Sequence, residues 1–189
     1  MLGEPLPVEF ANTVFVANGE LADGLTRPAH LAAWLHDCDR FATPLPDTAL
    51  SGLGPAQLAR ARALRDAVRS LLTATVAGTA PGPEAVETVN RTCRRAPIWR
   101  ELAWDDNDPR AMPHTAADPV TAALAELAQQ TVDLLSGPRR HELRACGAPR
   151  CVLLFVRDHP RREWCSPSCG NRARVARHYQ RHRTPRPTR

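Results

Sequence analysis

The sequence predicts a mainly α-helical protein with small β-hairpins, an α+β arrangement in two parts. Apolar residues recur at helical spacing in several segments between residues 6 and 136. Two other stretches, residues 98–114 and 152–164, contain short strand-like runs separated by turn residues. Two close pairs of cysteines flank the second of these stretches. We therefore expect helices to build the main core and a small C-terminal part to depend on its cysteines.

Five helices are expected in the N-terminal part. Proline or a capping residue marks the start of most of them, and glycine marks the expected ends at Gly19, Gly78 and Gly137. Between the second and third helices, residues 39–55 are rich in Pro, Gly and Thr, which predicts a loop. The expected helices cover Leu6–Ala17, Pro28–His36, Pro55–Ala77, Glu84–Arg94 and the segment from Pro119 to the terminating Gly137.

A β-hairpin is expected between the fourth and fifth helices. Residues 98–104 alternate in polarity, residues 105–109 supply a turn, and residues 110–114 return. A short connector, residues 138–145, then leads into the cysteine-rich segment. Cys38 and Cys93 stand alone in helix-like contexts, so we expect them to be small apolar core residues.

The four remaining cysteines have the spacing of a zinc site. Cys146 and Cys151 form one pair, Cys165 and Cys169 form the other, and thirteen residues separate the pairs. Each pair can supply one edge of the tetrahedron that Zn²⁺ requires. The insert predicts a hairpin, with residues 152–156 as one strand, a turn at residues 158–160 and residues 162–164 returning. A helix is expected to begin at Pro167 after the N-cap Ser166, which gives the treble-clef arrangement of knuckle, hairpin and helix.

Other pairings of these cysteines are less consistent with the sequence. Two disulfides would fit a secreted protein, and nothing marks this chain as secreted. A site of Cys165 and Cys169 with His178 and His182 has only eight residues between Cys169 and His178, against about twelve in a two-Cys, two-His finger. That arrangement would also leave the first cysteine pair unused. Four thiolate ligands are therefore the prediction.

The segment Cys169-Gly170-Asn171-Arg172 spells the motif of the CGNR zinc-finger family, which this part of the chain resembles. Members usually carry the finger behind an N-terminal ABATE domain and are described as bacterial, stress-related transcription regulators. Residues 9–13, EFANT, are similar to the ABATE signature (Asp/Glu)-Phe-x-Asn-Thr. The resemblance implies an ABATE-like helical domain at residues 1–137 and a CGNR treble-clef zinc finger with a basic tail at residues 138–189.

Arginines gather near the C-terminal end. Residues 139–189 hold fourteen arginines and three acids, a net charge of +11, whereas residues 1–138 carry a net charge of −6. Such a segment is an electrostatic footprint for a polyanion, and double-stranded DNA is the partner we expect. On the last helix, a basic face of Arg174, Arg177 and Arg181 should be exposed, while Val175 and Tyr179 should pack toward the zinc.

Further arginines can add to this face, including Arg186 and Arg189 in the tail. Two alternatives stay open for Asn171 and Arg172, which either support the zinc knuckle or read bases. The candidate nucleic-acid contacts are Asn171, Arg172, Arg174, Arg177, Arg181, Arg161, Arg162 and Arg183.

Together these observations predict a zinc-dependent DNA-binding protein, a bacterial transcription regulator whose N-terminal domain senses a small molecule or forms a homodimer. The alternative is a protein- or RNA-interaction module without sequence-specific DNA binding. Catalysis is not expected, because four thiolates leave zinc no open position and no catalytic constellation stands out. No signal peptide or membrane span is expected, so the predicted location is the cytoplasm.

Overall fold

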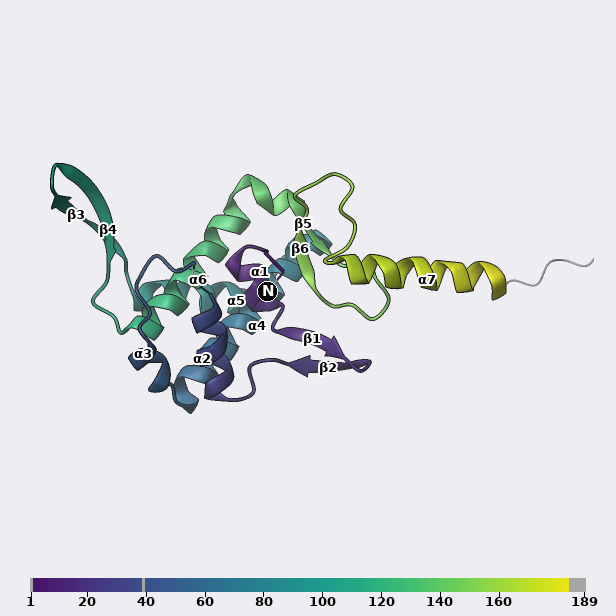
Figure 1. The fold of residues 1–189 in the computed structure, drawn as a ribbon, viewed down its shortest axis with the longest axis horizontal. Coiled ribbons are helices and arrows are strands. Elements are labelled where there is room, and N and C mark those ends of the chain that lie inside the picture. The colour runs from purple at the N-terminus through teal and green to yellow at the C-terminus, as the bar shows by residue number, and fades with distance from the viewer. Residues whose placement is uncertain (1, 39, 184–189) are drawn as a thin grey trace, which may run out of the picture.

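The computed structural model describes residues 2–38 and 40–183, with the side chains of residues 181–183 left out. Helices dominate this part of the chain and are accompanied by three two-stranded antiparallel sheets (Figure 1). The mainly α class with small hairpins is therefore confirmed. The core lies where α1, Leu6–Ala11, packs against the long helices α4, Pro55–Ala77, and α6, Pro119–Ser136.

The two long helices begin and end as the sequence predicts. Gly78 takes the left-handed conformation, with φ of 66°, after the last turn of α4. Asp118 caps α6, because its carboxylate accepts a hydrogen bond from the Thr121 amide at 3.0 Å. Helix α5, Pro83–Arg95, packs against both. The apolar faces of α4 and α6 supply many of the core side chains, including Leu64, Val68, Leu72, Leu124 and Leu127.

The first predicted helix is wrong over its second half. Helix α1 ends at Ala11, and a hairpin follows in which β1, Val14–Ala17, pairs with β2, Glu20–Asp23. Asn18 and Gly19 form its two-residue turn with positive φ angles of 53° and 88°. Asn-Gly is the strongest short hairpin turn, and the β-branched residues around Phe15 favour a strand, so local turn chemistry outweighs the apolar spacing.

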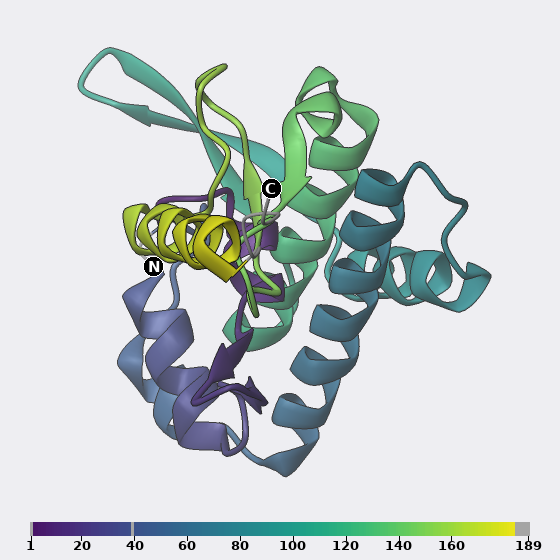
Figure 2. The same cartoon turned by 90° about the vertical axis from the view of Figure 1, so that its right-hand side faces the viewer.

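The middle of the chain follows the prediction with one addition. Helix α2 covers Pro28–Asp37, and the predicted loop after it contains a short helix, α3, Asp47–Ser51. The predicted hairpin is present, with β3, Trp99–Asp105, paired to β4, Asp108–His114. Figures 1 and 2 show this hairpin extending well away from the helices.

The C-terminal hairpin pairs differently from the prediction. A 3₁₀ turn, Pro138–Glu142, leads into β5, Leu143–Ala145, within the predicted connector. Strand β6, Leu154–Val156, pairs with β5 and not with residues 162–164, which return as a loop. The reason is burial: Leu143, Leu154 and Val156 all join the core built by the N-terminal helices. Helix α7, Pro167–Arg183, begins where the sequence predicts.

Candidate metal centre and its flanking helix

Four cysteines from two separate segments, the β5–β6 loop and the start of α7, meet at one point. Cys146 follows β5, Cys151 closes the loop before β6, Cys165 precedes α7, and Cys169 lies in its first turn. Their sulfur atoms all lie within 4.8 Å of one another. The Sγ–Sγ separation is 3.5 Å for Cys165–Cys169, 3.7 Å for Cys151–Cys169 and 3.8 Å for Cys151–Cys165. Zinc–sulfur bonds of about 2.3 Å in a tetrahedron place sulfurs about 3.8 Å apart, so the site fits this ion.

Backbone hydrogen bonds hold both cysteine pairs in position. In the first pair, the Cys146 amide donates to the Leu153 carbonyl at 2.9 Å, and the Cys151 amide donates to the Ala148 carbonyl at 3.0 Å. In the second pair, the Cys169 amide donates to Ser166 Oγ at 3.3 Å, which confirms Ser166 as the N-cap of α7. A knuckle and a capped helix start therefore present the thiols.

Three of the thiols, those of Cys151, Cys165 and Cys169, differ in acidity. Burial raises the pKa of Cys151 to about 11 and also raises the pKa of Cys165. Burial acts in the same direction on Cys169, but hydrogen bonds from Ser166, Cys165 and Arg172 outweigh it and lower its pKa to about 7. Arg172 Nη2 lies 2.9 Å from Cys169 Sγ. One sulfur is thus prepared as a thiolate, whereas ionisation of the buried thiols calls for a bound cation.

The residues after Cys169 contact the cysteine cluster and the indole of Trp164 beside it. A Cβ on Gly170 would lie 3.0 Å from Trp164 Cδ1, so a larger residue would require the indole to shift by a few tenths of an ångström. The guanidinium of Arg177 lies over the same indole, 5.7 Å from the ring centroid. With Arg172 donating to a sulfur and Asn171 accepting from Arg174, these contacts favour the structural interpretation of the motif.

Helix α7 projects away from the rest of the molecule (Figure 1). Only its first turns touch the cysteine cluster, where Ala173 is 4% exposed. The prediction that Val175 and Tyr179 pack toward the metal is wrong, because these residues are 54% and 65% exposed. Of the candidate DNA contacts, Asn171, Arg172, Arg174, Arg177 and Arg161 are exposed. The side chains of Arg181 and Arg183, and all of Arg186 and Arg189, lie outside the described residues.

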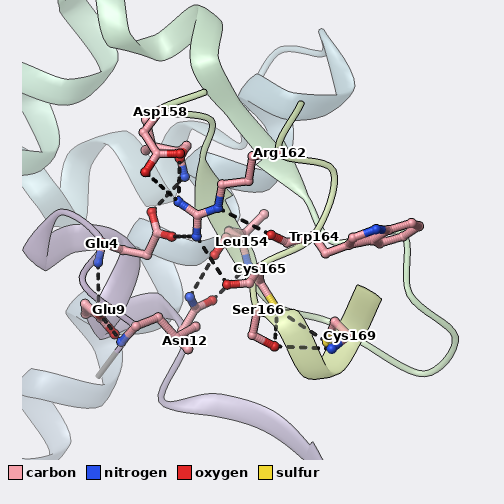
Figure 3. Close-up of polar contacts among 12 residues, drawn as sticks. Glu4, Glu9, Asn12, Leu154, Asp158, Arg162, Trp164, Cys165, Ser166 and Cys169 are labelled. Carbon is pink, nitrogen blue, oxygen red and sulfur yellow. Dashed lines mark hydrogen bonds and ion pairs between the residues drawn. The ribbon is translucent and has the colours of Figure 1, made fainter. Parts of the chain in front are cut away.

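Arg162, another candidate contact, is instead bound to the segment that precedes α1. Its guanidinium forms an ion pair with Glu4, a side chain only 2% exposed, and donates to the carbonyl of Val156 (Figure 3). It also lies 3.4 Å from Asp158 and donates to the Cys165 carbonyl at 3.2 Å. Arg162 is therefore held in a network of ion pairs and hydrogen bonds within the molecule. It does not extend the basic surface of α7.

Further polar contacts fix the cysteine-rich segment on the helices. Asn12, at the end of α1, donates to the Leu154 carbonyl at 2.8 Å and accepts from its amide at 2.9 Å (Figure 3). Arg69 of α4 donates to the Val152 carbonyl at 2.8 Å. The roles of Glu4 and Arg69 could not be predicted from the sequence, because nothing near them in the chain signals a partner so far away. Asn12 did carry a signal, since it lies in the EFANT segment, which is similar to the ABATE signature.

Comparison with known families agrees with this two-part organisation. A family model named ABATE, described as "Putative stress-induced transcription regulator", matches residues 4–138. The chain belongs to the ABATE family. A second model, the CGNR zinc finger, matches residues 142–182 of this ABATE protein and covers all four cysteines. No curated protein matches the sequence. Among the described residues, no helix has the length and apolarity needed to cross a membrane.

The ABATE signature has a structural role in this protein. The Glu9 carboxylate accepts from the amides of Leu2 and Glu4, at 2.6 and 3.0 Å, and so holds the segment that carries Glu4. Phe10 is fully buried against Trp34, with ring centroids 5.0 Å apart. Because Glu4 and Asn12 both bond β6, the signature links the ABATE part to the finger. Between them lies a cavity of about 640 Å³, whose walls include Phe15, Trp34, Arg150, Cys151, Ser168 and Arg172.

Proposed function

We propose that this ABATE protein binds Zn²⁺ through Cys146, Cys151, Cys165 and Cys169 and binds double-stranded DNA through α7, acting as a transcription regulator. The observation that carries the proposal is the projecting helix α7, which starts at the cysteine cluster and exposes Arg174 and Arg177. An α-helix fits the major groove of B-DNA, where arginine can contact phosphates or pair with guanine.

Zinc has a defined part in this proposal. Four thiolates would complete its tetrahedron and leave no open position, so the ion stabilises structure and catalyses nothing. By joining Cys169 to the knuckle, it fixes the first turn of α7 to the rest of the finger. The Glu4–Arg162 contact then fixes the finger to the ABATE part. The helix is presented to DNA from a rigid base, while Arg172 supports the metal site.

The ABATE part supplies regulation in this proposal. The cavity between it and the finger is where we place a small-molecule effector, because Cys151 and Arg172 form part of its wall. A ligand there would contact the metal centre's own surroundings and the start of α7. This arrangement supports coupling between effector binding and the orientation of the helix.

The test is the binding of duplex DNA by the zinc-loaded full chain at several salt concentrations. If Arg174 neutralises one phosphate, Arg174→Ala should weaken binding to all sequences alike and make the slope of log K against log[salt] shallower by about 1. Arg91→Ala is the matched control, since Arg91 is an exposed helical arginine on α5. It should keep both the affinity and the slope of the wild type.

Two results would contradict the proposal. If Arg174→Ala behaves like Arg91→Ala, this face of α7 does not meet DNA. If the zinc-loaded wild type binds no duplex even at low salt, DNA binding is excluded for the chain. The protein- or RNA-interaction alternative, for which the exposed Val175 and Tyr179 offer contact area, then takes its place.

A further inference from the structure

The β3–β4 hairpin is an apolar ribbon without a covering layer. It extends beyond the helices (Figures 1 and 2), and within residues 2–38 and 40–183 its strands pair only with each other. Leu102 is 69% exposed and Trp104 is 64% exposed. Their side chains share one face with those of Pro109, Ala111 and Pro113, which lie opposite on β4. A two-stranded hairpin is marginally stable alone in water, and three or more strands are more robust.

The two outer edges of this hairpin differ in their capacity for pairing. Asp106 and Asn107 form a two-residue turn with positive φ, so the flanking residues Asp105 and Asp108 make the first hydrogen-bonded pair. Hydrogen-bonded and non-hydrogen-bonded pairs alternate along the hairpin from there. Residues of the non-hydrogen-bonded pairs point their N–H and C=O groups away from the partner strand, toward the outer edge. On β4 the outward positions are 109, 111 and 113, two of them prolines without an N–H. On β3 the outward positions are Arg100, Leu102 and Trp104, and each keeps its donor and acceptor.

We propose that β3 pairs antiparallel with β3 of a second copy of this chain, around a two-fold axis at Leu102. The proposal follows from the difference between the edges: prolines block one edge, as natural proteins do to prevent strand addition, and the other is left open. Pairing turns two two-stranded ribbons into one four-stranded sheet. It is an isologous interface, because each copy contributes the same strand.

Charge selects the register of this pairing. With Leu102 opposite its own copy, Arg100 lies opposite Trp104, Glu101 opposite Ala103, and Trp99 opposite Asp105, so no like charges meet.

The neighbouring registers are less favourable. A shift that centres the axis on Glu101 places two glutamates directly opposite each other, and a shift to Ala103 places Glu101 opposite Asp105. A shift to Arg100 opposes two arginines, and a shift to Trp104 leaves only a few residues paired.

In the selected register the apolar faces of both hairpins lie on the same side of the joined sheet. The two Leu102 side chains meet at the axis, and each Arg100 stem and guanidinium lies beside Trp104 of the other copy, a cation–π arrangement. The hairpin lies at the far end of the molecule from α7 (Figure 1), so pairing leaves the cysteine cluster and α7 accessible. The inference therefore does not rest on DNA binding.

The experiment measures the solution mass of the zinc-loaded full chain by sedimentation equilibrium over a range of concentrations. We expect the wild type to approach twice the chain mass of 20.8 kDa. Leu102→Lys and Leu102→Glu should each shift the protein to the monomer mass, because two like charges then face each other at the axis. Both substitutions are on an exposed side chain, so the fold should persist, and far-UV circular dichroism checks this.

Two further samples make the result specific. Ala111→Lys adds a charge to the same face of the same hairpin, but on β4 away from the proposed pairing, and should remain a dimer. An equimolar mixture of Leu102→Lys and Leu102→Glu should recover the dimer mass, because opposite charges then meet at the axis. A monomeric wild type at all concentrations overturns the proposal. So does a mixture that stays monomeric, or an Ala111→Lys variant that dissociates as fully as Leu102→Lys.

Discussion

Glu4→Ala should markedly destabilise the chain, although Glu4 is far from the cysteines in sequence. Its buried carboxylate accepts from Arg162 and from the Val156 amide at 2.8 Å. Breaking a buried ion pair by removing one partner costs about 3–5 kcal/mol. Because Arg162 keeps Asp158 and remains 23% exposed, we expect the lower end, about 3 kcal/mol. For a chain of this size that corresponds to a fall in Tm of about 6–12 °C.

The assay is thermal unfolding of the zinc-loaded protein, followed by far-UV circular dichroism. Glu87→Ala is the matched control, because Glu87 also pairs with an arginine, Arg94, at 2.6 Å but is 55% exposed. Exposed pairs contribute about 0–1 kcal/mol, so its Tm should fall by no more than about 4 °C. If Glu4→Ala falls no further than Glu87→Ala, the contact between the ABATE part and the finger is not the stabilising link that we infer.

Two further predictions concern Arg172 and Asp23. Arg172→Ala should lower zinc affinity about 10–100-fold in competition with a chelator, because the Cys169 thiolate loses its donor, whereas Arg174→Ala should leave it unchanged. Burial raises the pKa of Asp23, but hydrogen bonds from Arg65 and Leu25 and the charges of Arg65 and Arg62 lower it overall. Asp23 therefore stabilises the fold above its unfolded pKa of about 3.9, and this stabilisation is lost as pH falls through the lower folded value. The difference in free energy of unfolding between wild type and Asp23→Asn should be large at about pH 6 and shrink toward about pH 3. A difference that stays constant over this pH range would contradict the stabilising role of the Asp23 carboxylate.

The parts of the fold that depend on local signals could be predicted from the sequence. Helices α2, α4 and α6 follow apolar periodicity between capping residues, and the structure places them within a residue or so of the expected bounds. The start of α7 follows from Ser166 and Pro167. The convergence of the four cysteines also follows from spacing alone, because metal ligands come in close pairs.

The remaining features depend on contacts between distant segments. The second half of the first predicted helix is a hairpin, since its Asn18-Gly19 turn outweighs a short apolar pattern. The partner of β6 could not be found locally, because the core built by α1 and α4 decides which strand is buried. Two arginines of α4 show the same dependence: the side chain of Arg65 is 3% exposed beside Asp23, and Arg69 donates to carbonyls. Their partners lie more than forty residues away in the chain.

X-ray absorption at the zinc edge of the purified protein tests the central claim most directly. We expect one zinc ion per chain with four sulfur neighbours at about 2.3 Å. Zinc should be lost on changing any one of the four cysteines of the cluster to serine, and kept in Cys38→Ser and Cys93→Ser. Nitrogen neighbours at about 2.0 Å, with zinc surviving in Cys146→Ser and vanishing in His178→Ala, would contradict the four-cysteine site and the presentation of α7 that depends on it.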